Sequence, residues 1–246
     1  MALVAQGEGD YMIDALIFDK DGTLFDFRQS WGAWAARLLA ELEPDADRRA
    51  VLAQAIGFDA ARMDFAPDSP VIAATAPEIA EAMLPHLAPE AAGSLVDRMN
   101  LLAAEAPTVE AVPLVPLFTS LKARGLKIGL ATNDTETPAR THLRNHGVLD
   151  LFDFVAGYDS GYGGKPAPGQ LLAFAQHLGL HPARIAMVGD SRHDMEAGRA
   201  AGMTCIAVLT GIALHDELAP HADLVLDHIG ALPGWLDSLP VETPGR

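Results

Sequence analysis

The 246-residue sequence is poor in cysteine and in positive charge, and each shortage excludes a class of protein. Its only cysteine, Cys205, cannot form an internal disulfide, and its place in the apolar run TCIAVLT indicates a buried, inert thiol. Lys and Arg total 17 against 33 Asp and Glu, which gives a net charge of −16. That charge repels nucleic-acid backbones and anionic membrane surfaces, so we expect neither as a partner.

Long apolar segments are also missing. No window approaches the run of about 18 uncharged apolar residues that a membrane-spanning helix requires. The N-terminal stretch MALVAQGEGDYMID lacks the basic and apolar regions of a secretion signal, so we expect a cytoplasmic protein that is neither exported nor inserted. Half of the residues are hydrophobic, which at this length favours one large domain or a domain with an insertion.

Short apolar runs that end in Gly, Asp or Thr predict strands. The clearest are ALIFD, KIGLAT, IAMVGD and TCIAVLTG, and the weaker ones are FDFVAG and ADLVLD. Because these runs are continuously apolar, they indicate a parallel sheet with helices over both faces. The helical patterns between them each close on a glycine that suits a left-handed C-cap: LFTSLKARG, TPARTHLRNHG, PGQLLAFAQHLG and DMEAGRAAG.

Residues 27–112 differ from the rest of the chain because they show no convincing strand. Amphipathic helical patterns follow one another there, with predicted starts at Ser30, at Asp47, at Thr75 with Glu78 at capping-box spacing, and after Pro89. The segment returns through PTVEAVPLVP, whose prolines suggest a hinge or linker. We therefore expect a helical cap domain of residues 27–112, inserted into a catalytic core of residues 1–26 and 113–246.

Carboxylates gather at the ends of the predicted strands. The carboxyl ends of parallel strands line the ligand crevice of a doubly wound sheet, and three runs place Asp19, Thr132 and Asp190 there. Asp19 and Asp21 would repel each other unless a cation neutralised them, and such an all-oxygen set suits Mg²⁺. A further carboxylate, Asp194, is either a metal ligand or an acid that stabilises a helix N-terminus.

Groups that could hold a phosphoryl oxygen are present as well. Lys165, in the loop GYGGKPAPG, offers a point positive charge. Thr132 and Asn133, in LATND, offer hydrogen-bond donors at the end of a predicted strand. Together these residues predict a phosphate site beside the carboxylates.

The order DKDGTLFD, LATND, GGKPAPG and VGDSRHDMEAGRAAGM resembles the four motifs of haloacid dehalogenase-superfamily phosphatases over nearly the whole chain. The resemblance implies an α/β fold with a Rossmann-like, doubly wound, mainly parallel core and a mobile helical cap, as in phosphoglycolate phosphatase-like members. It also implies a Mg²⁺-dependent phosphatase that acts on a small phosphorylated metabolite through an aspartyl-phosphate. We expect a monomer or homodimer.

The resemblance assigns a role to each motif residue. Asp19 matches the nucleophile that attacks phosphorus, and Asp21 matches the general acid and base. Thr132 and Lys165 match the pair that holds the phosphate. The implied metal ligands are Asp19, the backbone carbonyl of Asp21, Asp190 as the main carboxylate and, as an open alternative, Asp194.

One residue departs from the family pattern. Lys20 stands where such phosphatases usually carry a bulky apolar residue. Strand alternation predicts that its side chain points away from Asp19, which favours a structural or field-modulating role over a catalytic one.

Several other side chains favour structural interpretations. Four histidines lack partners at zinc-ligand spacing and are expected on solvated helices or loops: His142, His146, His177 and His193. Trp31 and Trp34, three residues apart, are expected to pack within the cap, with substrate stacking as the alternative. The candidates for binding an anionic leaving group are Arg28, Arg37 and Arg62, although arginines on a helix surface are commoner.

Rival functions remain open. A phosphosugar mutase resembles this chain in every motif, because it also passes through an aspartyl-phosphate. A non-catalytic phosphate-binding module could use the same fold. A metal-free dehalogenase is disfavoured because that branch needs no acid at the Asp21 position. A phosphonatase is disfavoured because residues 27–112 contain no lysine for a Schiff base.

Overall fold

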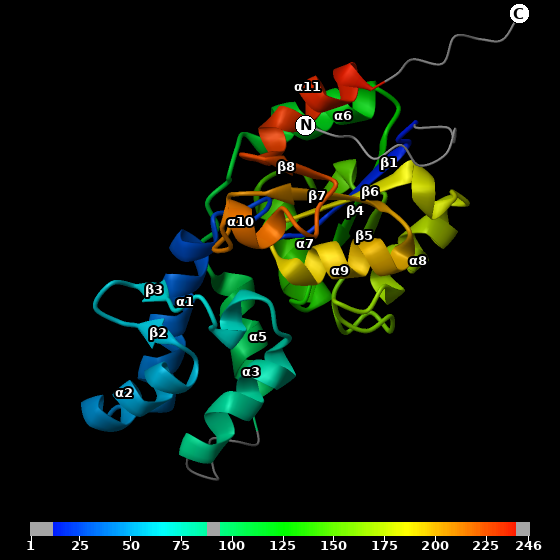
Figure 1. The fold of residues 1–246 in the computed structure, drawn as a ribbon. Coiled ribbons are helices and arrows are strands. Elements are labelled where there is room, and N and C mark those ends of the chain that lie inside the picture. The colour runs from blue at the N-terminus through cyan, green and yellow to red at the C-terminus, as the bar shows by residue number, and fades with distance from the viewer. Residues whose placement is uncertain (1–11, 88–93, 240–246) are drawn as a thin grey trace, which may run out of the picture.

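A computed structural model describes residues 12–87 and 94–239 of the chain. Figure 1 shows a sheet flanked by helices and, beside it, a separate group of helices built from the segment between β1 and α6. No helix in residues 12–87 and 94–239 combines the length and the apolarity needed to cross a membrane.

Six parallel strands form the main sheet, in the order β5-β4-β1-β6-β7-β8. They are β1 Ala15–Phe18, β4 Lys127–Ala131, β5 Phe154–Ala156, β6 Ile185–Gly189, β7 Thr204–Val208 and β8 Leu224–Leu226. All six lie in the apolar runs that predicted strands. Because β1 lies between β4 and β6, the carboxyl ends of these three strands are neighbours, at the switch point where ligands bind in a doubly wound sheet.

Helices cover both faces of this sheet, as the continuous apolarity of its strands predicts. Leu16 and Phe18 of β1 pack with buried residues of the helices on one face, and Ala15 and Ile17 pack with those on the other. The first face carries α6 Leu114–Ala123, α7 Glu136–Asn145 and α11 Leu232–Ser238, and the second carries α8 Gly169–Leu178 and α9 Arg192–Ala201. The short α10, His215–Leu218, packs near α9 and the thiol of Cys205.

The glycines that predicted helix ends all have the expected backbone conformation. Each lies at or just after the C-terminus of its helix with a positive φ: Gly125, Gly147, Gly179 and Gly202. Helix α6 begins at Leu114, earlier than the predicted pattern, because Pro116 falls in its first turn, where no backbone N–H is needed.

The segment that leaves the sheet after β1 has a hydrophobic core of its own. Its helices are α1 Phe27–Leu42, α2 Ala46–Ala55, α3 Ala76–Met83 and α5 Leu95–Glu105. The buried residues of this core, among the described part of the chain, all come from positions 27–103. Separate cores support the division into a core of residues 1–26 and 113–246 and a cap of residues 27–112, which we retain as a proposal.

The cap departs from the predicted pattern at its helix starts. Helix α1 begins at Phe27 rather than Ser30, because the Asp26 side chain caps it by accepting from the Gln29 N–H. Helix α3 follows the predicted capping box, in which the Glu78 carboxylate accepts from the Thr75 N–H. The predicted start of the last pattern, at Pro89, lies outside the described residues.

The expectation of a cap without strands is wrong for one small element. Strands β2 Phe58–Asp59 and β3 Asp64–Phe65 pair antiparallel, and the rings of Phe58 and Phe65 lie 5.0 Å apart. Strands of this length leave no apolar run in the sequence, so pattern reasoning has nothing to detect.

The two connections between the cap and the sheet run together. The Asp26 N–H donates to the Val109 carbonyl at 2.8 Å, and the Ala111 N–H donates to the Leu24 carbonyl at 2.9 Å. The proline-rich return segment is therefore paired with the outgoing one, which satisfies backbone groups at the junction.

Candidate active site

The predicted strand-end residues meet at one edge of the sheet. Asp19, Thr132 and Asp190 each follow the last residue of a strand, β1, β4 and β6. The register pairs Phe18 with Leu130 and with Val188, so the three polar residues lie side by side. All three are buried in the protein, although their side chains are polar.

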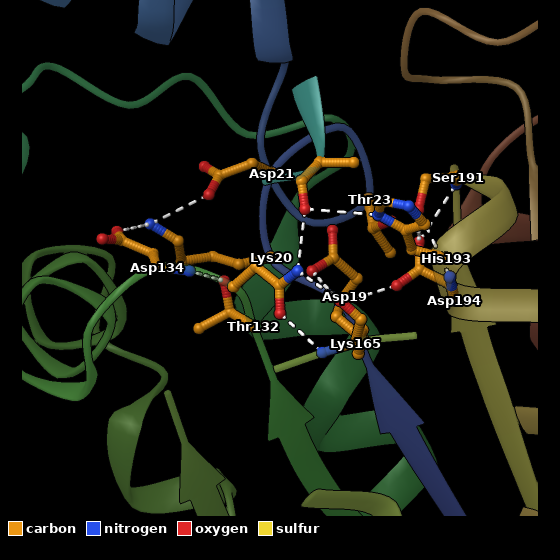
Figure 2. Close-up of polar contacts among 12 residues, drawn as sticks. Asp19, Lys20, Asp21, Thr23, Thr132, Asp134, Lys165, Ser191, His193 and Asp194 are labelled. Carbon is orange, nitrogen blue, oxygen red and sulfur yellow. Dashed lines mark hydrogen bonds and ion pairs between the residues drawn. The ribbon is translucent and has the colours of Figure 1, made fainter. Parts of the chain in front are cut away.

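Lys165 lies among the carboxylates (Figure 2). Its Nζ donates to Asp19 Oδ1 at 2.6 Å and to Asp194 Oδ1 at 2.6 Å. The backbone of Lys165 is held by Asn133, whose Oδ1 accepts from the Lys165 N–H at 2.8 Å and whose Nδ2 donates to the Lys165 carbonyl at 2.8 Å. The Asn133 amide is thus committed to the backbone, which favours a positioning role over the predicted contact with phosphate.

Asp194 combines two contacts. It is the third residue of α9, where its Oδ2 accepts from the Ser191 N–H at 3.0 Å and from the Ser191 hydroxyl at 2.6 Å. Its other oxygen accepts from Lys165. Asp194 thus caps the N-terminus of α9. It can also serve as a metal ligand, because carboxylate oxygens of Asp19, Asp190 and Asp194 lie within 4.8 Å of one another.

The donor set fits a divalent cation. Burial raises the pKa of Asp19 to about 7 although Lys165 lowers it, and burial with two neighbouring carboxylates raises the pKa of Asp190 well above its usual range. One lysine does not neutralise three carboxylates, and an all-oxygen set with excess negative charge suits a hard cation such as Mg²⁺. Two glycines allow the backbone to approach Asp190 closely. A Cβ on Gly22 would lie 2.3 Å from Asp190 Oδ2, and a Cβ on Gly211 would lie 1.7 Å from it.

Lys20 makes a second buried charge cluster (Figure 2). Its Nζ lies 2.6 Å from Asp134 Oδ2, 3.1 Å from Asp21 Oδ2 and 3.2 Å from His142 Nδ1. Burial lowers the pKa of Lys20, but Asp134 and Asp21 outweigh burial and raise it. The side chain extends toward Asp134, whereas Asp19 pairs with Lys165, so Lys20 points away from Asp19 as strand alternation predicts.

The expectation that His142 is solvated is wrong. Its side chain is buried, and its Nε2 lies 2.9 Å from the Ala103 carbonyl of the cap. Burial and the neighbouring Lys20 lower the pKa of His142 to about 4. The spacing from Ala139 to Leu143 on α7 marks this helix face as buried, and that signal could have found His142.

The other histidines differ from one another. His177 is exposed, as expected, whereas His146 contacts Glu110 at 2.9 Å and Thr108 at 2.8 Å. His193 is partly buried, and its Nδ1 lies 3.4 Å from the Ala73 carbonyl. Asp134 was missed as a member of the site, although it stands directly after Asn133 in the LATND motif.

A cavity that is partly open to solvent lies between the strand ends and the cap. The strand ends and the loop before α8 contribute the predicted residues Asp19, Asp21, Thr132, Asn133, Lys165 and Asp190. Trp34 packs inside the cap, where its Nε1 donates to the Met99 carbonyl at 3.2 Å, and Trp31 stands edge to face against it at 5.0 Å. Packing within the cap is confirmed, and both tryptophans also line the cavity.

The candidate arginines for an anionic leaving group are on the surface. Arg28 pairs with Asp64 at 3.0 Å, and Arg37 pairs with Glu105 at 2.8 Å. Arg62 is exposed, and the described wall of the cavity includes none of the three arginines.

Comparisons with known proteins agree with this geometry. Residues 13–202 match the model of the haloacid dehalogenase-like hydrolases. The phosphoglycolate phosphatase of Yersinia pseudotuberculosis is 38% identical over 116 residues, which are 47% of this chain and 50% of that protein. That of Rhodospirillum rubrum is 34% identical over 120 residues, which are 49% of this chain and 50% of that protein. The chain thus spans about half the length of the curated relatives it matches.

Solved structures share the fold. A hydrolase from Pseudomonas syringae has a TM-score of 0.66 at 23% identity, over 92% of this chain and 99% of that one. The β-phosphoglucomutase of Clostridium difficile has a TM-score of 0.62 at 21% identity, over 90% of this chain and 93% of that one. At these identities the likeness shows the fold alone.

Proposed function

The chain belongs to the haloacid dehalogenase-like hydrolases, and on that premise we propose that it is a Mg²⁺-dependent phosphatase that hydrolyses a small phosphomonoester through an aspartyl-phosphate. The observation that carries the proposal is the placement of Asp19 beside Lys165 at the floor of the cavity, with Asp21 on the same wall. Nucleophile, cation and acid are then within one small site.

Asp19 is the proposed nucleophile. One of its carboxylate oxygens attacks phosphorus as the bond from phosphorus to the leaving oxygen breaks, and the leaving oxygen takes the electron pair. Lys165 holds the attacking carboxylate in place and reduces its repulsion from the phosphate. A Mg²⁺ held by Asp19, the Asp21 carbonyl and Asp190 would neutralise charge on the phosphoryl oxygens.

Asp21 is the proposed acid and base. Burial raises the pKa of this carboxyl, and Lys20 lowers it. Lys20 holds Oδ2 at 3.1 Å, whereas Oδ1 is buried near the Trp31 indole, which lowers the pKa of the carboxyl without an aligned hydrogen bond among the described residues. The free oxygen can give its proton to the leaving oxygen, and then take one from the water that attacks the phosphorus and breaks the bond to Asp19.

Thr132 is the proposed neutral phosphate donor. Its Oγ1 accepts from the Asp134 N–H at 3.1 Å, which leaves the hydroxyl proton free to donate toward the cavity. Gln170 fixes the Thr132 backbone by donating to its carbonyl at 3.1 Å. This arrangement orients the hydroxyl before substrate binds, which is the form of stabilisation that enzymes use for anionic transition states.

The alternatives are weaker. A phosphosugar mutase must hold a second sugar hydroxyl with polar groups, whereas the cap wall of this cavity is mostly apolar. A non-catalytic module would have no use for both a free acid oxygen and a buried nucleophile at matching strand ends. Relatives named phosphoglycolate phosphatase support phosphomonoester hydrolysis without identifying the substrate of this chain.

Phosphate release from an aryl phosphate tests the proposal. We expect turnover with Mg²⁺, loss of turnover after prolonged chelation, and inhibition by Ca²⁺, which prefers more ligands at longer distances and misaligns the attack. Ionic strength must be held constant so that screening is not mistaken for coordination. Asp19→Asn should abolish turnover, with exposed Asp150→Asn as the matched control. Full activity in chelator, or in Asp19→Asn, would refute the mechanism.

A further inference from the structure

The cap residues that line the cavity limit which leaving groups the substrate can have. We infer that the leaving group of the substrate is an uncharged, apolar alcohol or phenol that carries no carboxylate. This inference rests on the proposed function and concerns the same site. It distinguishes the chain from a phosphatase whose leaving group is glycolate.

The wall that faces the strand ends is apolar. It is formed by the cap residues Phe27, Trp31, Trp34, Val71, Ile79 and Met99, with small alanines between them. Asn100 is the one amide or charged side chain that the cap adds to the described wall. The phosphoryl group must lie by Lys165 and Thr132, so the leaving group points at this surface. Apolar surface of this kind is favourable for a ring and unfavourable for an ion.

The cations of the cap lie elsewhere. Arg28 and Arg37 are on the surface in ion pairs, and Arg48 pairs with Glu43 at 3.1 Å. Arg49 donates to the Glu43 carbonyl at 3.1 Å. The sequence of residues 88–93, APEAAG, contains no basic side chain.

The strand ends do not offer a second cation either. Lys165 is engaged by Asp19 and Asp194, and the carboxylates of Asp21 and Asp190 also face the cavity. A carboxylate on the leaving group would therefore find no free positive charge among these residues, because Lys165 and the proposed Mg²⁺ are engaged by the carboxylates and the phosphoryl group. His193 is the remaining basic side chain on the described wall, and the experiment below must address it.

Two neutral donors near the phosphate position, Asn133 and Ser191, are already used. Both Asn133 amide hydrogens are donated, to the Ala73 carbonyl at 2.7 Å and to the Lys165 carbonyl at 2.8 Å. The Ser191 hydroxyl donates to Asp194 at 2.6 Å. A carboxylate needs several donors to replace its hydration, and these side chains cannot supply them.

Trp31 supplies one exception. Its Nε1 is buried near the Asp21 carboxyl, whose pKa it lowers, and neither Nε1 nor Asp21 Oδ1 has an aligned hydrogen bond among the described residues. Both residues line the cavity, so a leaving group there would meet an acid oxygen, the indole N–H of Trp31 and the amide of Asn100. A buried donor without a partner is costly unless a ligand or water satisfies it. The leaving group can therefore include one hydrogen-bond acceptor, but the wall does not provide for an ion.

Binding of two non-hydrolysable phosphonates tests the inference without relying on turnover. The compounds are 3-phosphonopropionate, the isostere of phosphoglycolate, and 2-phenylethylphosphonate, the isostere of benzyl phosphate. Calorimetry on the full chain with Mg²⁺ should show that the phenyl compound binds at least about tenfold more tightly. Equal binding, tighter binding of the carboxylate, or binding of neither compound would overturn the inference.

Turnover of the corresponding esters separates the inference from the proposed function. We expect kcat/KM for benzyl phosphate to exceed that for phosphoglycolate by about tenfold or more; both are alkyl esters, so leaving-group reactivity does not dominate the comparison. Preferred hydrolysis of phosphoglycolate would overturn the inference and leave the phosphatase intact. Selective binding of the phenyl phosphonate with no hydrolysis of any ester would refute the proposed phosphatase activity and leave the inference about the wall intact.

A charge introduced on the wall gives an independent readout. Asn100→Lys should shift the ratio of the two phosphonate affinities toward the carboxylate by about tenfold, and the uncharged Asn100→Met, of similar length, should not. An unchanged ratio in Asn100→Lys would count against a wall that lacks a cation. In wild type, a carboxylate preference that His193→Gln removes would show that His193 recognises an anion, which also overturns the inference.

Discussion

Gly211 lies so close to Asp190 that a Cβ on it would fall 1.7 Å from Asp190 Oδ2. The loop after β7 thus presses its backbone against the carboxylate that we propose as the main metal ligand. No side chain fits there, so the position of Asp190 depends on a residue that carries no chemistry itself.

Gly211→Ala should therefore weaken the metal site. We expect the Mg²⁺ concentration for half-maximal phosphate release to rise by about tenfold or more, because displacement of a ligand by a fraction of an ångström disturbs octahedral coordination. Gly234→Ala is the matched control, since nothing lies within 4 Å of its new Cβ. Equal metal dependence in the two variants would contradict the role given to this contact.

Lys165→Ala should lower kcat strongly and have a smaller effect on the free energy of unfolding. One preorganised, charge-assisted donor is typically worth about 10²- to 10³-fold in kcat. The variant also leaves Asp19 and Asp194 without their shared cation, so added Mg²⁺ should restore part of its stability. Phosphate-release kinetics and thermal unfolding check these outcomes, with the more exposed Lys127→Ala as the control. Unchanged kcat would place the phosphate elsewhere.

Lys20→Met should destabilise the fold, because it leaves the carboxylates of Asp21 and Asp134 buried without their cation. Breaking a buried pair in this way typically costs roughly 3–5 kcal/mol. Adding Asp134→Asn removes one of the unpaired charges and should recover part of the loss. Urea unfolding of the two single variants and the double variant measures the coupling. Strictly additive effects would show that Lys20 and Asp134 do not stabilise each other.

His142 should make stability depend on pH. Burial and Lys20 hold its pKa at about 4 in the folded protein, below its ordinary value of 6.5, so the unfolded chain binds more protons between these two pH values. Its contribution is complete above the upper value and is lost as the pH falls toward the lower one. At about pH 5 the loss relative to neutral pH should be about 2 kcal/mol.

The matched variant for this prediction is His142→Gln, which retains hydrogen-bonding groups but does not titrate. Urea unfolding at about pH 7.5 and about pH 5 should show a smaller decrease for the variant than for wild type. If the two proteins lost equal stability over this pH interval, His142 would not be the cause of the pH dependence.

Local patterns in the sequence were enough to predict the sheet and the polar residues at the carboxyl ends of its strands. The runs that became β1, β4 and β6 are continuously apolar because both faces of the sheet are covered, and the polar residue after each run must lie at the carboxyl end of a strand. The same pattern predicts that Asp19, Thr132 and Asp190 lie together, as the register of the strands shows. Glycines at helix ends were predictable for a similarly local reason, since a left-handed C-cap favours a residue without a Cβ.

Tertiary structure alone decided which partners the buried charges have and what the cap presents to the cavity. Lys20 meets Asp134 and His142 across 114 and 122 residues of sequence, and no periodic pattern encodes contacts between such distant positions. The sequence made the cap arginines candidates for binding an anion. In the structure Arg28 and Arg37 form ion pairs on the surface, and Trp31 and Ile79 line the cavity instead. A helix pattern shows that one face is buried, but only packing determines whether that face meets another helix or the substrate.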